Sequence, residues 1–83
     1  MSPQVLTIDR VKIGDNLKRW REYQLMTQQE LADAAELGVA SVVRIENNRT
    51  EPRFSTIKKL AHALGLEARQ LISERPPELV DEE

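Results

Sequence analysis

Two short helical patterns separated by only a few residues constrain this chain more than any other feature of its sequence. The first begins with a capping box, in which Thr27 and Glu30 satisfy each other's exposed backbone donors, and it extends to about Ala35. Gly38 then interrupts the pattern, and a second helix is predicted over Val39–Asn47. A joint this short makes the two helices cross steeply, at roughly 90–120°, as in a helix-turn-helix.

Three further helices are predicted around this pair, because apolar residues recur at helical spacing over Val11–Tyr23, Phe54–Leu64 and Glu67–Ser73. Gly65 suits the left-handed residue that ends a helix, and Pro76 stops the last one. No segment alternates with a period of two for long enough to form a strand. We therefore expect an all-α fold of five helices whose core includes Trp20, Leu31, Ala32, Val42, Ile45, Ile57, Leu60 and Leu64.

Length and composition point to one small domain that relies on its apolar core alone. The chain has 83 residues and no cysteine, which excludes a disulfide framework and a thiolate metal site. Its apolar runs are far shorter than the ~20 residues of a membrane helix, and its first residues lack the features of a signal peptide. We expect a soluble, cytoplasmic domain over residues 11–73, with a flexible arm at 1–10 and an acidic tail at 74–83.

The distribution of charge matters more than the formal net charge of −2. All twelve Lys and Arg lie between Arg10 and Arg75, together with nine Asp and Glu, so that segment carries a net charge of +3. Residues 78–83 carry four acids and no base. A mildly basic body permits a nucleic-acid partner without requiring one.

Residues 28–47 resemble the helix-turn-helix of phage repressor and Cro-type regulators, the XRE family. The resemblance covers about residues 11–72 and rests on the joint spacing of Ile13-Gly14, Leu17, Arg21, Gln28, Glu30-Leu31-Ala32, Val42, Ile45-Glu46, Pro52, Leu60-Ala61, Leu64-Gly65 and Leu71. It implies a lambda-repressor-like, five-helix domain that binds double-stranded DNA as a homodimer, with helix 39–47 in the major groove. It also implies a structural ion pair between Arg21 and Glu46, and a small repressor, Cro-like regulator or antitoxin-type autoregulator as the function.

Outward residues at the start of helix 39–47 are the candidates for reading DNA bases: Val39, Ala40, Val43 and Arg44. The arginine suits guanine O6 and N7, whereas the other three offer only apolar contact, for example to thymine methyl groups. Val39 and Val43 fit a partly buried position almost as well. The candidates for DNA-phosphate contacts are Gln28, Gln29, Ser41, Asn47, Asn48, Arg49 and Arg53. Lys58 and Lys59 fit better as a solvated helix face.

The turn departs from the family pattern, which usually has glycine where this chain has Glu36. A non-glycine residue with positive φ costs about 1 kcal/mol. We therefore expect Gly38 to relocate the bend and to lengthen the joint between the two helices.

A protein–protein interaction module that reuses the fold is the alternative function, with Val39, Ala40 and Val43 contacting a partner protein. The sequence has no nucleophile–base pair, no glycine-rich phosphate loop and no cluster of metal ligands, so we expect no enzyme, metal site, cofactor or small-molecule ligand. The lone histidine, His62, is expected to be a surface or packing residue. The apolar candidates for a dimer interface are Leu66, Leu71, Ile72, Leu79 and Val80, of which Leu66 and Leu71 fit the core equally well.

Overall fold

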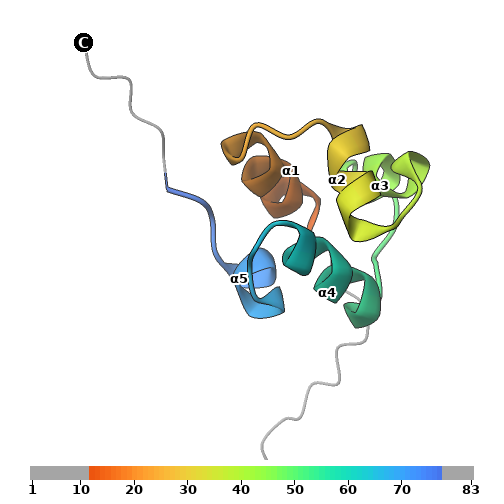
Figure 1. Cartoon of the computed structure of the whole chain (residues 1–83). Helices are drawn as coiled ribbons and strands as arrows, with labels where there is room; N and C mark the ends of the chain where they lie inside the picture. Colours follow the sequence, from red (N-terminus) through yellow and green to blue (C-terminus); the bar gives the residue numbers. More distant parts are fainter. Residues whose placement is uncertain (1–11, 78–83) are drawn as a thin grey trace, which may run out of the picture.

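The structure, a computed structural model, describes residues 12–77 and contains five helices in that range (Figure 1). They are α1 (Gly14–Tyr23), α2 (Gln28–Ala35), α3 (Val39–Glu46), α4 (Phe54–Ala63) and α5 (Ala68–Ser73). No strand occurs among these residues, so the all-α prediction is confirmed. The predicted arm at 1–10 and the acidic residues 78–83, with Leu79 and Val80, lie outside the described residues.

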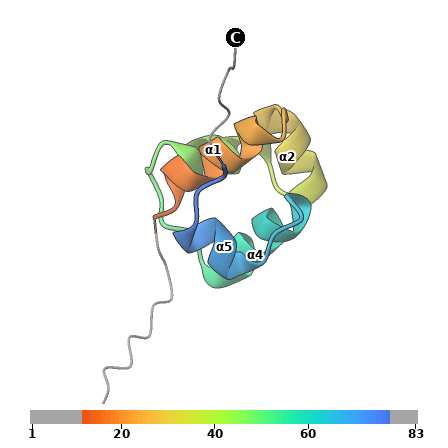
Figure 2. The ribbon, with the colours of Figure 1, turned by 90° about the vertical axis from the view of Figure 1, so that its left-hand side faces the viewer.

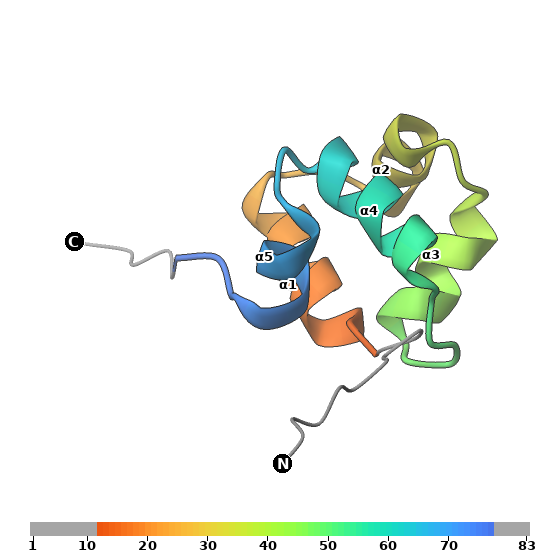
Figure 3. The same cartoon turned by 90° about the horizontal axis from the view of Figure 1, so that it is seen from below.

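The five helices pack as a closed ring. α1 contacts α3 and α5, α2 contacts α3 and α4, and α4 contacts α5. In Figure 2, α1 and α2 lie in the upper part of the ring, and α4 and α5 lie in the lower part. α3 therefore lies at the end of the molecule opposite α5 (Figures 1 and 3).

Apolar side chains from every helix fill the centre of the ring: Ile13, Leu17, Trp20, Leu31, Ala32, Ala35, Val42, Ile45, Ile57, Leu60, Ala61, Leu64 and Leu71. This set contains every side chain that the sequence predicted for the core. Leu71, which also fitted a dimer interface, is fully buried and belongs to the core. Among the described residues, no helix combines the length and the apolar character needed to cross a membrane.

Four of the helices end in the same way, with a residue in the left-handed region and a hydrogen bond that reaches back over the last turn. The left-handed residues have φ between 56° and 72° and are Leu25, Glu36, Asn48 and Gly65. The closing bonds run from the N–H of the next residue to the carbonyl five residues earlier: Met26 to Arg21, Leu37 to Ala32, Arg49 to Arg44, and Leu66 to Ala61. This is the Schellman motif, which lets a short loop turn sharply away from a helix.

The prediction that Gly38 relocates the bend was wrong. Glu36 itself adopts the left-handed conformation, with φ 61°, whereas Gly38 has φ −75° and is the N-cap of α3. The Schellman bonds and the packing of Leu37 against the core hold Glu36 in this conformation. The joint between α2 and α3 is therefore short, in spite of its non-glycine turn residue.

α1 begins in direct contact with the end of α3. The backbone N–H of Gly14 donates to Oδ1 of Asn48 at 3.1 Å and so receives the cap that the side chain of Ile13 does not provide. A Cβ atom at Gly14 would lie 2.6 Å from the carbonyl oxygen of Glu46 and 2.7 Å from that of Ile45. Glycine at this position therefore permits the close approach of the two helices.

Polar side chains of α1, and of the residue directly after it, also cap two other helices. Asn16 Nδ2 donates to the carbonyl of Ile72 at 3.1 Å, and Trp20 Nε1 donates to the carbonyl of Glu74 at 2.9 Å, both at the end of α5. Gln24 Nε2 donates to the carbonyl of Leu64 at 2.7 Å, at the end of α4. α1 thus holds the ring closed through hydrogen bonds as well as through its apolar face.

Replacing Gly14 by serine should lower the free energy of unfolding by about 1–3 kcal/mol, because the new Cβ meets backbone atoms that cannot move independently. The matched control is Gly38→Ser, where a Cβ meets nothing within 4 Å and serine is a favoured N-cap residue. Urea denaturation of both variants measures the difference. Equal stability of the two variants would contradict the close approach at Gly14.

Replacing Glu36 by glycine should raise the free energy of unfolding by about 0.5–1 kcal/mol, because relief of the left-handed backbone exceeds the added entropy of the unfolded chain. Gly65→Ala is the reciprocal test: its Cβ meets nothing within 4 Å, so the expected loss of about 1 kcal/mol reports backbone strain alone. Thermal melts show whether each variant is more or less stable than the original protein. A destabilised Glu36→Gly variant would refute the backbone strain assigned to Glu36.

Candidate nucleic-acid interface

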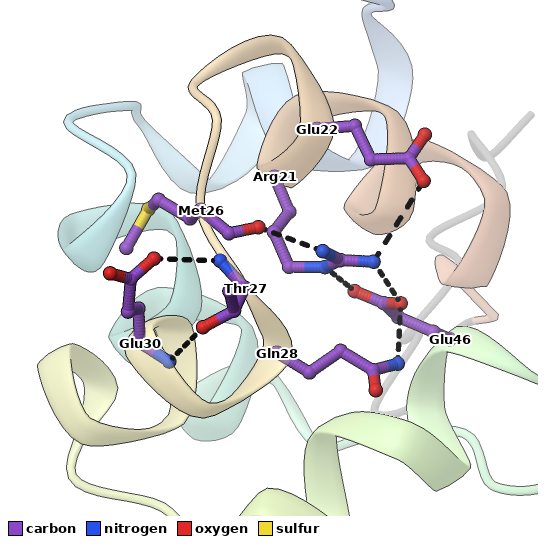
Figure 4. Close-up of polar contacts among 7 residues, drawn as sticks. All are labelled: Arg21, Glu22, Met26, Thr27, Gln28, Glu30 and Glu46. Atoms are coloured by element: carbon purple, nitrogen blue, oxygen red, sulfur yellow. Dashed lines mark hydrogen bonds and ion pairs between the residues drawn. The ribbon is translucent and has the colours of Figure 1, made fainter.

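A buried ion pair joins α1 to α3 behind the outward face of α3. Arg21 Nε donates to Glu46 Oε2 at 2.6 Å, and Arg21 Nη2 donates to Glu46 Oε1 at 3.1 Å (Figure 4). The two side chains are 11% and 2% exposed. The third nitrogen, Nη1, donates to the carbonyl of Met26 at 2.8 Å in the loop between α1 and α2. The structure thus brings together the two residues that the family resemblance paired.

The hydrogen bond from Arg21 to Glu46 raises the pKa of the guanidinium above its ordinary value, against the opposing effect of desolvation. An arginine guanidinium is not deprotonated in proteins in any case, so the pair keeps its positive partner. A bidentate contact also fixes the angle between the two side chains. The pair consequently orients α1 and α3 relative to each other.

Gln28, at the start of α2, belongs to the same cluster. Its Nε2 donates to Glu46 Oε1 at 3.0 Å, and in Figure 4 its side chain extends toward the carboxylate. Beside it, Thr27 and Glu30 form the predicted capping box, with bonds of 2.8 and 3.0 Å. The half-buried Gln28 side chain is therefore held in place at the surface, and its predicted phosphate contact stays a prediction.

The outward face of α3 lies on the side opposite the buried Val42, Ile45 and Glu46. Val39 is 37% exposed, which makes it one of two exposed large hydrophobic side chains among the described residues. Ala40 and Arg44 are exposed, and Val43 and Ser41 are half-buried. The four residues predicted to read bases thus line an accessible surface that is apolar apart from one guanidinium.

Cationic and amide side chains are exposed on α2, on α4 and on the segment that follows α3. Arg49 and Arg53 are exposed in the segment between α3 and α4, as is Asn47 at the end of α3. Asn48 is exposed; its Oδ1 accepts from Gly14, and its amide nitrogen is the group that can donate to a DNA phosphate. Gln29 is exposed and donates to Asp33 Oδ1 at 2.9 Å. Lys58, Lys59 and His62 are exposed on α4.

A hollow of about 200 Å³ separates α3 from the start of α4, lined by Leu37, Ser41, Arg44, Ile45, Thr50, Pro52 and Thr56. Two of the predicted DNA contacts, Ser41 and Arg44, meet here. The hydroxyl groups of Thr50 and Thr56 join them, although the sequence analysis did not single out either residue. Thr50 precedes the turn at Pro52 and Thr56 follows it in α4. The packing of α4 against this segment brings Thr56 beside α3.

A second hollow, of about 320 Å³, lies where α1 begins and brings Arg75, from the other end of the domain, beside Lys12 and Arg19. Lys12, Arg19 and Arg75 line it together with Asn48 and one acid, Asp15. Sequence analysis did not find this group, because its members come from both ends of the domain. These cations lie beside Asn48, which follows α3, and along the first turns of α1.

Replacing Glu46 by alanine should destabilise the protein by about 3 kcal/mol, because Arg21 is left buried without its carboxylate. That loss is a large part of the stability of a domain this small. The double variant Arg21→Met/Glu46→Leu removes both charges and should recover most of it. Guanidinium denaturation measures the free energy of unfolding of the two variants. A double variant that is less stable than Glu46→Ala would show that the pair contributes net stability rather than orientation.

Comparison with known proteins agrees with this architecture. Residues 17–71 match the family model of the helix-turn-helix family HTH_3. The chain is 32% identical over 62 residues to the immunity repressor protein of Bacillus phage phi105, a match that covers 75% of this chain and 43% of the repressor. The chain thus spans less than half the length of this curated relative.

Solved structures share the fold. The restriction-modification controller protein C.AhdI from Aeromonas hydrophila is 33% identical, with a TM-score of 0.70 over 74% of this chain and 92% of its own. The biofilm master regulator SinR, solved in complex with DNA, is 26% identical, with a TM-score of 0.69 over 74% of this chain and 98% of its own. The family match confirms the XRE-type resemblance, and the chain belongs to the helix-turn-helix family HTH_3.

Proposed function

We propose that this chain is a sequence-specific regulator of transcription that binds double-stranded DNA with α3 in the major groove. The observation that carries the proposal is the accessible outward face of α3, with the exposed cations Arg49 and Arg53 beside it. Family membership supports it, as do a relative named as a repressor and a neighbour solved with DNA. The role is one of binding and not of catalysis.

The proposed interface makes two kinds of contact with DNA, to phosphates and to base edges. Arg49 and Arg53, with the amides of Gln28 and Asn48, are assigned to phosphates, which fix the position of the protein but carry no base information. The remaining phosphate candidates are Gln29, Ser41 and Asn47. Arg44 is assigned to a guanine edge, because it is exposed on the helix that would enter the groove.

The regulator acts as a homodimer in this proposal, since two copies related by a two-fold axis would read half-sites about one helical turn apart. Of the apolar candidates for the interface, Leu66 and Ile72 are half-buried and remain available, whereas Leu71 is in the core. The proposal covers a small repressor, a Cro-like regulator and an antitoxin-type autoregulator.

A protein-interaction module is the second candidate, favoured by the exposed apolar side chain of Val39. Binding of mixed-sequence duplex DNA at low and high salt separates the two. Salt-sensitive binding supports the regulator, and its absence at low salt supports the interaction module.

Arg53→Ala should weaken binding to all duplexes alike and reduce the slope of log affinity against log salt by about one unit, because one phosphate contact is lost. Arg44→Ala should instead reduce affinity for a selected site by about 1–3 kcal/mol and relax the preference at one base pair. Fluorescence anisotropy with a selected duplex and a random duplex measures both effects.

Lys58→Ala is the matched control, since it removes an exposed cation that has no assigned contact and should leave both quantities unchanged. If Arg44→Ala weakens random DNA as much as the selected site, Arg44 binds a phosphate. The hydroxyls of Ser41, Thr50 and Thr56, which line the same hollow, would then complete that phosphate site.

A further inference from the structure

The residues that face outward along the first half of α3 have no side-chain hydrogen-bonding group before Arg44. Gly38 has no side chain, Val39 and Ala40 are exposed and aliphatic, and Val43 is half-buried beside them. The nearest hydroxyl, that of Ser41, lies in the hollow on the α4 side. Side chains of this kind cannot distinguish a donor from an acceptor on the edge of a base.

One chemical feature of the major groove is still available to an aliphatic surface: the methyl group on C5 of a pyrimidine. Thymine presents this methyl beside its O4 acceptor, whereas cytosine presents an N4 donor and no methyl group. A 5-methylcytosine carries the methyl at the same place as thymine. An aliphatic side chain therefore meets the same group in both bases, although their hydrogen-bonding edges are opposite.

We propose that the Val39–Ala40–Val43 surface recognises the 5-methyl group of a pyrimidine, and that it accepts thymine and 5-methylcytosine alike. This inference rests on the proposed function, because it requires α3 to lie in the major groove. Arg44, one turn after Ala40, supplies the polar contact to a neighbouring guanine. The regulator would then respond to cytosine methylation within its own binding site.

The expected size of the effect follows from the burial of one methyl group. Removing one methyl group from water contributes about 0.8 kcal/mol to the free energy of binding, which corresponds to a change in affinity of about three- to fourfold. The effect is smaller than that of a bidentate arginine contact, so it modulates binding without abolishing it.

The test begins with duplexes selected from a random pool, in which thymines are replaced one at a time by uracil to find the position that contacts the surface. Four duplexes are then compared at that position: T·A, U·A, 5-methylC·G and C·G. We expect T·A and 5-methylC·G to bind with similar affinity, and each to bind about three- to fourfold more tightly than its unmethylated counterpart. Binding is measured by anisotropy at constant salt.

Two variants make the comparison specific. Val39→Ala should reduce or remove the preference for the methyl group, and its melting temperature should change little because the side chain lies outside the core at the start of α3. Val43→Ala gives the same readout for the second valine. Arg53→Ala is the matched control: it should weaken all four duplexes by the same factor and keep their ratios.

Four results would overturn the inference. If no thymine of the selected duplexes can be replaced by uracil with a loss of affinity, or if C·G binds as tightly as 5-methylC·G at the position found, the recognition of the methyl group is refuted while DNA binding stands. A methyl preference that neither valine variant changes refutes its assignment to this surface. If no duplex is retained from the random pool at low salt, the proposed function fails and this inference fails with it.

Discussion

The bidentate contact between Arg21 and Glu46 is the interaction on which the geometry of the helix-turn-helix depends. It joins α1 to α3 directly, reaches the loop before α2 through the carbonyl of Met26, and holds Gln28 at the start of α2. Because Glu46 is buried, each of its oxygens needs a partner, and Arg21 on α1 and Gln28 on α2 supply them. The orientation of α3 follows from this requirement as much as from its apolar face.

Compactness comes from the way in which the helices end. Left-handed residues and Schellman bonds terminate α1, α2, α3 and α4, so each helix can turn sharply into the next within a few residues. Glu36 is held in the strained left-handed conformation because the next residue, Leu37, packs against the core. Asn48 has two roles, since its side chain caps α1 while its backbone turns the chain away from α3.

The surface that results combines rigid support with few polar groups for reading bases. Arg21 and Glu46 hold α3 from behind, and its outward face carries aliphatic side chains and one arginine. The exposed cations Arg49 and Arg53 follow α3 in the chain, and the proposal assigns them to the DNA backbone rather than to the bases. Under the proposed function, phosphate contacts supply the affinity, and discrimination is left to Arg44 and to shape and methyl contacts.

The sequence by itself determined the order of the helices, the inward stripes and the capping box of α2, because these depend on local spacing. It also indicated the pairing of Arg21 with Glu46, through the family resemblance. Only the tertiary structure decided that Glu36 forms the turn, since the packing that follows it offsets a local backbone preference. The close approach at Gly14 and the two hollows beside α3 and α1 were likewise decided there, because they join residues distant in sequence that no local pattern connects.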